Sequence, residues 1–138
     1  MQREQGLCRL LENRPVVCLD SYTVIEIEKM RTVKSFFALC NVMDEQIICS
    51  GGQVKDTVTN SVSRISIEAG NWEELPPLNI ARKDHASCAI DRAVFVFCGT
   101  AGDRRMSLNS IEKLNCSAKN PTRWQLIRVP AWMLSPRY

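Results

Sequence analysis

Hydrophobic and polar residues alternate along the chain in short runs that are rich in β-branched and aromatic side chains. Such runs are typical of half-buried β-strands, and the Gly, Asn, Asp and Pro residues that separate them favour turns. From residue 36 onward, the pattern predicts strands at 36–42, 46–50, 61–67, 71–75, 84–90, 93–98, 110–116 and 123–128. We therefore expect an all-β fold.

The predicted strands recur with a fixed spacing. At an offset of 48 residues, segment 34–42 aligns with 82–90, and segment 47–52 aligns with 95–100. The same offset applied backwards shows that the chain begins partway through a unit, and each complete unit contains four predicted strands. Because a four-stranded sheet exposes an apolar face that it cannot bury alone, we expect neighbouring sheets to stack face to face.

The first complete unit carries an ordered set of residues: a glycine pair, a tryptophan about twenty residues later, a proline turn, and a basic residue that opens the next unit. These residues are Gly51, Gly52, Trp72, Pro76, Pro77, Arg82 and His85. This string resembles a kelch repeat. The resemblance implies a partial kelch β-propeller with four-stranded antiparallel blades, two of them complete and one incomplete.

The second complete unit resembles the same repeat in degenerate form. It keeps Gly99 and Trp124, while Thr100 stands where the offset of 48 places the second glycine. Gly pairs at such positions allow positive φ and a close backbone approach.

The resemblance covers about residues 15–138 and divides the chain into segments. We expect an N-terminal tail or short helix at 1–14, an incomplete kelch blade at 15–33, a kelch blade at 34–81 and a degenerate kelch blade at 82–138. Leucines at helical spacing favour a helix in the first segment, and a frayed remnant of blade sequence is the alternative.

Kelch propellers usually close with about four to eight blades of about fifty residues each. Two complete blades leave strand edges and an apolar sheet face uncovered, and both features promote association. We expect the chain to be a fragment, a truncated gene product, or a partial propeller that is completed by self-association.

Composition and charge narrow the classes of function. The net charge of +3, from 18 Lys and Arg against 15 Asp and Glu, is too small and too dispersed to indicate nucleic-acid binding. No apolar run approaches the length of about 18 residues that a membrane helix needs, and the N-terminus lacks the pattern of a secretory signal. We therefore expect a cytoplasmic protein whose seven cysteines are reduced. A single His and the absence of a CxxC motif indicate no metal and no cofactor.

Three features could suggest catalysis, and a structural interpretation is favoured for each. His85 stands at the start of a predicted strand, where the kelch pattern commonly has this residue, so packing is the expected role. Cys88 follows it by three residues, but nothing in the sequence indicates a lowered thiol pKa at the equivalent Cys40. Glu73 and Glu74 are adjacent in a strand and point to opposite faces. We expect no enzyme activity.

The kelch resemblance implies a non-catalytic protein-protein interaction module, which presents loops to a partner such as an acidic peptide segment. It implies a possible role as the substrate-recognition part of a cullin-type E3 ubiquitin ligase, with an actin- or cytoskeleton-binding protein as the alternative and a propeller enzyme as the less favoured one. Polar residues at predicted loops or loop ends are the candidate partner-binding residues. They are Arg31, Lys34, Lys55, Asp56, Arg82, Lys83, Arg104 and Arg105.

Overall fold

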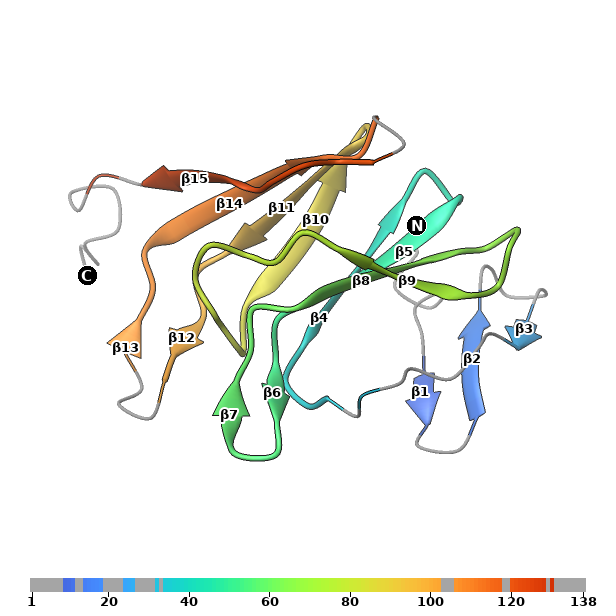
Figure 1. Cartoon of the computed structure of the whole chain (residues 1–138), viewed down its shortest axis with the longest axis horizontal. Coiled ribbons are helices and arrows are strands. Elements are labelled where there is room, and N and C mark those ends of the chain that lie inside the picture. Colours follow the sequence, from blue (N-terminus) through green and yellow to red (C-terminus); the bar gives the residue numbers. More distant parts are fainter. Residues whose placement is uncertain are drawn as a thin grey trace, which may run out of the picture.

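Every regular element that the structure describes is a β-strand, and all strand pairs are antiparallel (Figure 1). The computed structural model describes residues 9–11, 14–18, 24–26, 32, 34–102, 106–117, 120–128 and 130. Within these residues there is no helix, and the predicted all-β fold is confirmed.

Two four-stranded sheets make up most of the described chain. Blade 1 consists of β4 (Ala38–Val42), β5 (Gln46–Ser50), β8 (Val62–Ser66) and β9 (Trp72–Leu75), hydrogen-bonded in that order. Blade 2 consists of β10 (Ala86–Ile90), β11 (Ala93–Phe97), β14 (Ser110–Asn115) and β15 (Gln125–Arg128), in the same order. The predicted strands are therefore confirmed to within two residues at each end.

Two short hairpins continue the path from the second to the third strand of each blade. In blade 1, β6 (Gln53–Val54) pairs with β7 (Thr57–Val58), and in blade 2, β12 (Thr100–Ala101) pairs with β13 (Met106–Ser107). Figure 1 shows both hairpins at the same end of the molecule, which we call the hairpin end. The turns β4–β5 and β10–β11 lie at the opposite end, the turn end. Two-residue strands are too short to produce an alternating pattern, so the sequence did not predict them.

The N-terminal part contains a three-stranded sheet with the order β1 (Arg9–Leu11), β2 (Arg14–Cys18) and β3 (Val24–Glu26). β2 begins 48 residues before β8, as the repeat predicts. Residues 9–11 form a strand rather than part of the short helix considered for segment 1–14. Most of the rest of that segment lies outside the described residues.

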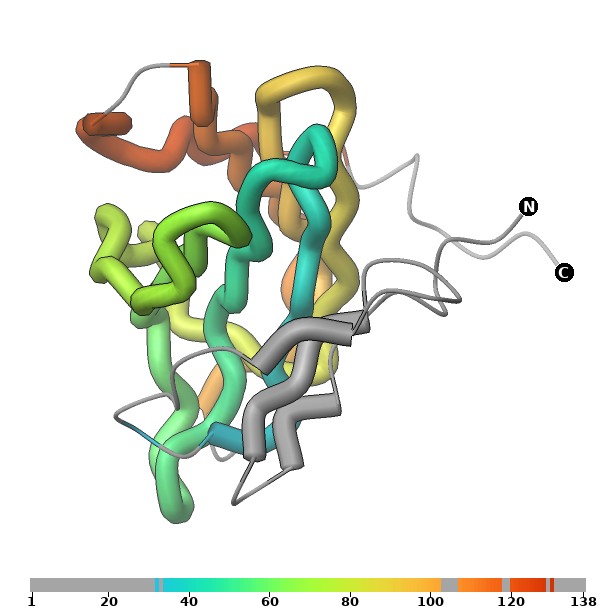
Figure 2. The backbone as a smooth tube through the Cα atoms, turned by 90° about the vertical axis from the view of Figure 1, so that its right-hand side faces the viewer, coloured from blue at the N-terminus to red at the C-terminus, as the bar shows by residue number. Residues whose placement is uncertain are grey.

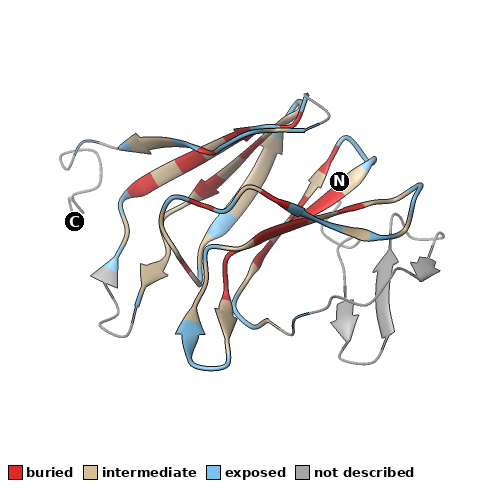
Figure 3. Ribbon diagram, viewed as in Figure 1, coloured by how far each residue is buried: buried red, intermediate tan, exposed pale blue. Residues whose placement is uncertain are grey.

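The two blades pack face to face and share one hydrophobic core (Figures 2 and 3). Alternate residues of β4 are buried, as its alternating pattern predicts. They belong to a cluster that includes residues from both blades: Cys40, Val42, Ile48, Val62, Leu75, Leu78, Val94, Val96, Leu114, Cys116 and Trp124. A hydrogen bond from Ser87 Oγ to the Leu39 carbonyl (3.1 Å) also crosses between β10 and β4.

The alignment of the glycines requires a correction, because one turn of blade 2 is shorter. Three residues, 43–45, connect β4 to β5, whereas two, 91–92, connect β10 to β11. As a result, β11 corresponds to β5 at an offset of 47 rather than 48.

Equivalent hydrogen bonds identify the matching residues. The carbonyl of Gly52 accepts from Thr59 N (2.9 Å), and the carbonyl of Gly99 accepts from Leu108 N (2.8 Å). Gly99 therefore matches Gly52, and its alignment with Gly51 was wrong by one residue. The position of Gly51 (φ 58°) is occupied in blade 2 by Cys98 (φ 55°).

Candidate functional site: the inter-blade cluster and the hairpin end

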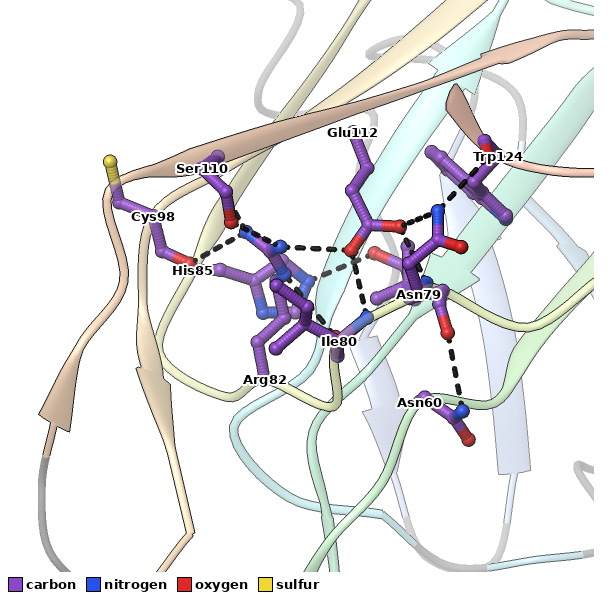
Figure 4. Close-up of polar contacts among 11 residues, drawn as sticks. Asn60, Asn79, Ile80, Arg82, His85, Cys98, Ser110, Glu112 and Trp124 are labelled. Atoms are coloured by element: carbon purple, nitrogen blue, oxygen red, sulfur yellow. Dashed lines mark hydrogen bonds and ion pairs between the residues drawn. The ribbon is translucent and has the colours of Figure 1, made fainter. Parts of the chain in front are cut away.

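Arg82 was expected to be displayed to a partner, and this expectation is wrong because its side chain is fully buried. Its guanidinium donates to the carbonyls of Cys98 (3.0 Å) and Ser110 (3.0 Å) and to Ser110 Oγ (2.9 Å), and it forms an ion pair with Glu112 (2.8 Å) (Figure 4). A weaker contact to the Ile80 carbonyl (3.5 Å) occupies its fifth donor. An arginine with all five donors satisfied in this way is a structural anchor.

Glu112 is the counter-charge of this anchor and was not predicted from the sequence. It is also fully buried, on the inward face of β14. Besides Arg82, it accepts from the backbone N–H of Asn79 (2.6 Å), from Asn79 Nδ2 (2.9 Å) and from the N–H of Ile80 (3.1 Å). The signal in the sequence was a charged residue at an inward position of an alternating strand, which needs a partner when buried.

These contacts fix the linker between the blades, which runs from the end of β9 to the start of β10. Trp124 Nε1 donates to the Pro76 carbonyl (2.8 Å), and Asn79 Nδ2 donates to the Trp124 carbonyl (3.0 Å). At the other side, Leu78 N and Asn60 Nδ2 join the linker to blade 1. We call Asn79, Arg82, Glu112 and Trp124 the inter-blade cluster. It holds blade 2 against the chain that enters it.

Blade 1 has a reduced version of the same arrangement. Lys34 is the equivalent of Arg82, and its Nζ donates to the carbonyl of Ser61 (3.3 Å), which matches Ser110. Ser63 stands where blade 2 has Glu112, so the buried carboxylate is absent at this position. Lys34 is half-buried in this contact, which limits its availability to a partner.

His85 packs between the blades. Its Nε2 lies 3.0 Å from Ser50 Oγ, and Ser50 is buried. Burial, together with the nearby positive charge of Arg82, lowers the pKa of His85 to about 4, so the ring is neutral at physiological pH. His85 Nδ1 is buried and has no hydrogen-bond partner among the described residues, so this Ser–His pair lacks the third group that orients a catalytic imidazole. The geometry is that of a packing contact.

The cysteines of the described chain are free thiols, and three of them, Cys40, Cys49 and Cys116, are buried. Burial is the main cause that raises the pKa of Cys40 to about 12, and it also raises the pKa of Cys116. Because the thiolate is the nucleophilic form, these two side chains are poor nucleophiles. The expectation of reduced core thiols is confirmed for these buried residues.

The hairpin end brings together two of the predicted partner-binding lysines and one aspartate. Lys83 Nζ donates to Gln53 Oε1 (2.7 Å), a contact that joins the start of blade 2 to β6. The same ammonium lies 5.5 Å from the centroid of the Phe36 ring, which is 56% exposed. Lys55 and Asp56 form the exposed tip of the β6–β7 hairpin.

The other predicted residues are not gathered there by the described structure. Arg82 is buried and Lys34 bonds within blade 1, as described above. Arg31, Arg104 and Arg105 lie outside the described residues.

The hairpin end also has a shallow, open pocket of about 610 Å³ beside β6–β7. Val54, Lys55, Thr57 and Ala81 contribute to its lining. In the described parts of the chain, no group of three or more His, Cys, Asp or Glu side chains is placed to bind a metal ion. Over the same residues, no helix has the length and apolar character needed to cross a membrane.

Comparison with known families gives one match: the Kelch motif model matches residues 36–79, which run from the start of blade 1 into the linker. No curated protein matches the chain. Together with the four-stranded antiparallel blades, the family match identifies a kelch repeat protein whose described fold is a partial kelch propeller. Kelch repeats are generally protein-interaction modules.

Proposed function

We propose that the chain is a non-catalytic interaction module whose hairpin end binds an acidic segment of a partner protein. The observation that carries this proposal is the contact between Lys83, Gln53 and the exposed ring of Phe36. It presents a cation beside an exposed aromatic side chain on a surface to which both blades contribute. Such a combination suits a carboxylate flanked by apolar groups.

Lys55 supplies a second positive charge at the tip of the β6–β7 hairpin, where it is fully accessible. Asp56 beside it limits how much negative charge can bind directly at the tip and contributes to selectivity. Arg104 and Arg105 belong to the same proposal as candidate residues of the chain between β12 and β13.

Binding to an array of short peptides with clusters of Asp and Glu, each with a matched Asn and Gln version, tests this function. We expect the acidic peptides to bind more tightly, and Lys55→Glu combined with Lys83→Met to weaken binding about tenfold, which corresponds to about 1.4 kcal/mol. Binding should also weaken as salt rises. Lys113→Glu, on a different face, is the matched control. Equal binding of acidic and amide peptides would overturn the proposal.

The role of this module in a larger assembly is a separate question. The substrate-recognition part of a cullin-type E3 ubiquitin ligase is the role that we propose from the resemblance, and actin binding is the alternative. Co-sedimentation with actin filaments and a pull-down with a cullin probe separate these roles, because only one of the two should retain the chain. The free thiols support the proposal of a reducing, cytoplasmic environment.

A further inference from the structure

Blade 2 has a second sheet face, which points away from blade 1. The register of the sheet places Cys88, Phe95 and Lys113 side by side on this outer face, with Ile90, Phe97 and Ile111 on neighbouring rows. Val94, Val96 and Leu114 point to the opposite face and are buried in the core shared with blade 1. On the outer face Ile90 is 59% exposed, and Phe95, Phe97 and Ile111 are only partly buried.

The matching face of blade 1 is covered. Cys40, Ile48 and Val62, which correspond to Cys88, Phe95 and Ile111, are buried in the core shared with blade 2. The same sheet face is thus buried in one blade and open in the other. The simplest occupant of the outer face would be a further blade packed as blade 2 packs on blade 1.

Cys98 prevents that packing. A β-carbon on Gly51 would lie 2.4 Å from the carbonyl oxygen of Arg82 and 2.7 Å from Cε1 of His85, distances that no blade contact can accept. Cys98 has the same backbone conformation as Gly51 and carries a real β-carbon. In addition, Phe97 replaces Ser50, which contacts His85 across the blades. A blade arriving in the same geometry would therefore clash at Cys98.

The charge on the outer face indicates what does fit. In blade 1, Arg64 is paired with Glu73 on the adjacent strand (3.0 Å). The equivalent residues of blade 2, Lys113 and Gln125, are also cross-strand neighbours, but the carboxylate has become an amide. The ammonium of Lys113 lies 5.7 Å from the centroid of the Phe95 ring, and within the described chain no carboxylate is paired with it.

A groove of about 520 Å³ adjoins Lys113 at the turn end. Its lining includes Ile90, Phe95 and Met43, which is 53% exposed. At the rim, Arg92 is already compensated by Glu45 (2.8 and 3.1 Å), and Asp91 lies in the turn beyond the strands. Lys113 is the one charged side chain among the strand residues on this face, so a second copy of the same face would bring a like charge rather than a carboxylate.

We propose that the outer face of blade 2 binds an apolar segment of a partner protein that brings an Asp or Glu carboxylate to Lys113. The apolar side chains of that segment cover Phe95, Ile90 and Met43. This surface is independent of the hairpin end, and it uses apolar burial with one central charge rather than a cluster of charges.

Selection of displayed random peptides against the whole chain tests this proposal. We expect the selected peptides to combine Leu, Ile, Phe or Met with an Asp or Glu. Lys113→Gln, which preserves most of the side chain's packing, should weaken their binding about tenfold, and Lys113→Glu should weaken it further. Peptides in which the acidic residue is replaced by Lys should bind the Lys113→Glu variant again. Lys55→Glu at the hairpin end is the matched control and should leave binding unchanged.

Three outcomes would overturn the proposal. The first is a set of selected peptides without acidic enrichment, and the second is binding that Lys113→Gln and Lys113→Glu leave unchanged. The third is self-association in sedimentation experiments that Ile90→Glu abolishes, because a second copy would then occupy the face. Loss of hairpin-end binding with Lys55→Glu, while this binding persists, would show that the two surfaces act separately.

Discussion

Blade 1 and blade 2 have the same four strands in the same order, but different interactions hold them. At the position where the chain enters each blade, blade 1 uses the Lys34 ammonium with a backbone carbonyl, while blade 2 uses the buried Arg82–Glu112 pair. Removing two charges from water is costly, and the cost is offset only when every donor and acceptor finds a partner. In blade 2 they do, which makes the pair a device for fixing the linker in one conformation.

The glycine position differs in the opposite sense. Gly51 of blade 1 lies against Arg82 and His85 of the next blade, so a side chain there is excluded. Cys98 of blade 2 carries a side chain at the same backbone conformation. The comparison teaches that a glycine in this repeat serves two purposes, positive φ and space for the following blade, and that blade 2 has lost both.

The largest effect is expected from Arg82→Met, which leaves Glu112 buried without a cation. We expect the free energy of unfolding to fall by about 3–5 kcal/mol. Lys34→Met is the matched change in blade 1, where no buried carboxylate is left unpaired, and it should cost less than about 1 kcal/mol. Urea unfolding of both variants measures the difference. Similar losses in the two blades would contradict the assigned role of Glu112.

The next largest effect is expected from Gly51→Ala. The positive φ and the close contact with the Arg82 carbonyl should together cost about 2–3 kcal/mol. Gly70→Ala isolates the first contribution, because Gly70 has φ 76° and nothing within 4 Å of the added β-carbon, so it should cost about 1 kcal/mol. Thermal unfolding of the two variants would weaken our explanation if Gly70→Ala were the more damaging change.

A smaller effect concerns pH and separates His85 from Phe37, its equivalent in blade 1. The pKa of His85 is lowered from 6.5 to about 4 in the folded chain, so protonation favours the unfolded state. The stability from the neutral ring is fully present above pH 6.5 and is lost as the pH falls toward 4, by about 1–2 kcal/mol after allowing for solvent screening.

His85→Phe should remove this dependence between pH 6.5 and 4.5, a window above the lowered pKa of Glu45. Unfolding midpoints measured across the window for the wild type and the variant check the prediction. A slope that persists in the variant would assign the pH dependence to other groups.

The smallest effect is expected from Cys98→Gly. Glycine relieves the cost of φ 55° for a side chain, offset in part by its greater freedom in the unfolded chain, so the net gain should be about 0.5–1 kcal/mol. Differential scanning calorimetry should show a higher Tm. A lower Tm would mean that the Cys98 side chain makes contacts worth more than the backbone strain.

Local patterns were sufficient for the strands. Alternation in segments such as Ala38–Val42 and Gln46–Ser50, bounded by turn residues, located each blade strand to within two residues. The short hairpins were missed because two residues show no period. The glycine alignment failed because the residue lost from the β10–β11 turn leaves no mark in the composition of the strands around it.

The sequence by itself determined the all-β fold, the repeat and the presence of a kelch motif, since these depend on residues close together in the chain. Only the tertiary structure decided that Arg82 is buried, because its partner Glu112 is 30 residues away on another strand. It also decided that Lys113 lacks the carboxylate that Arg64 has, a property of cross-strand pairing. The physical reason is the same in both cases: the state of a charge depends on its neighbours in space, and folding selects those neighbours.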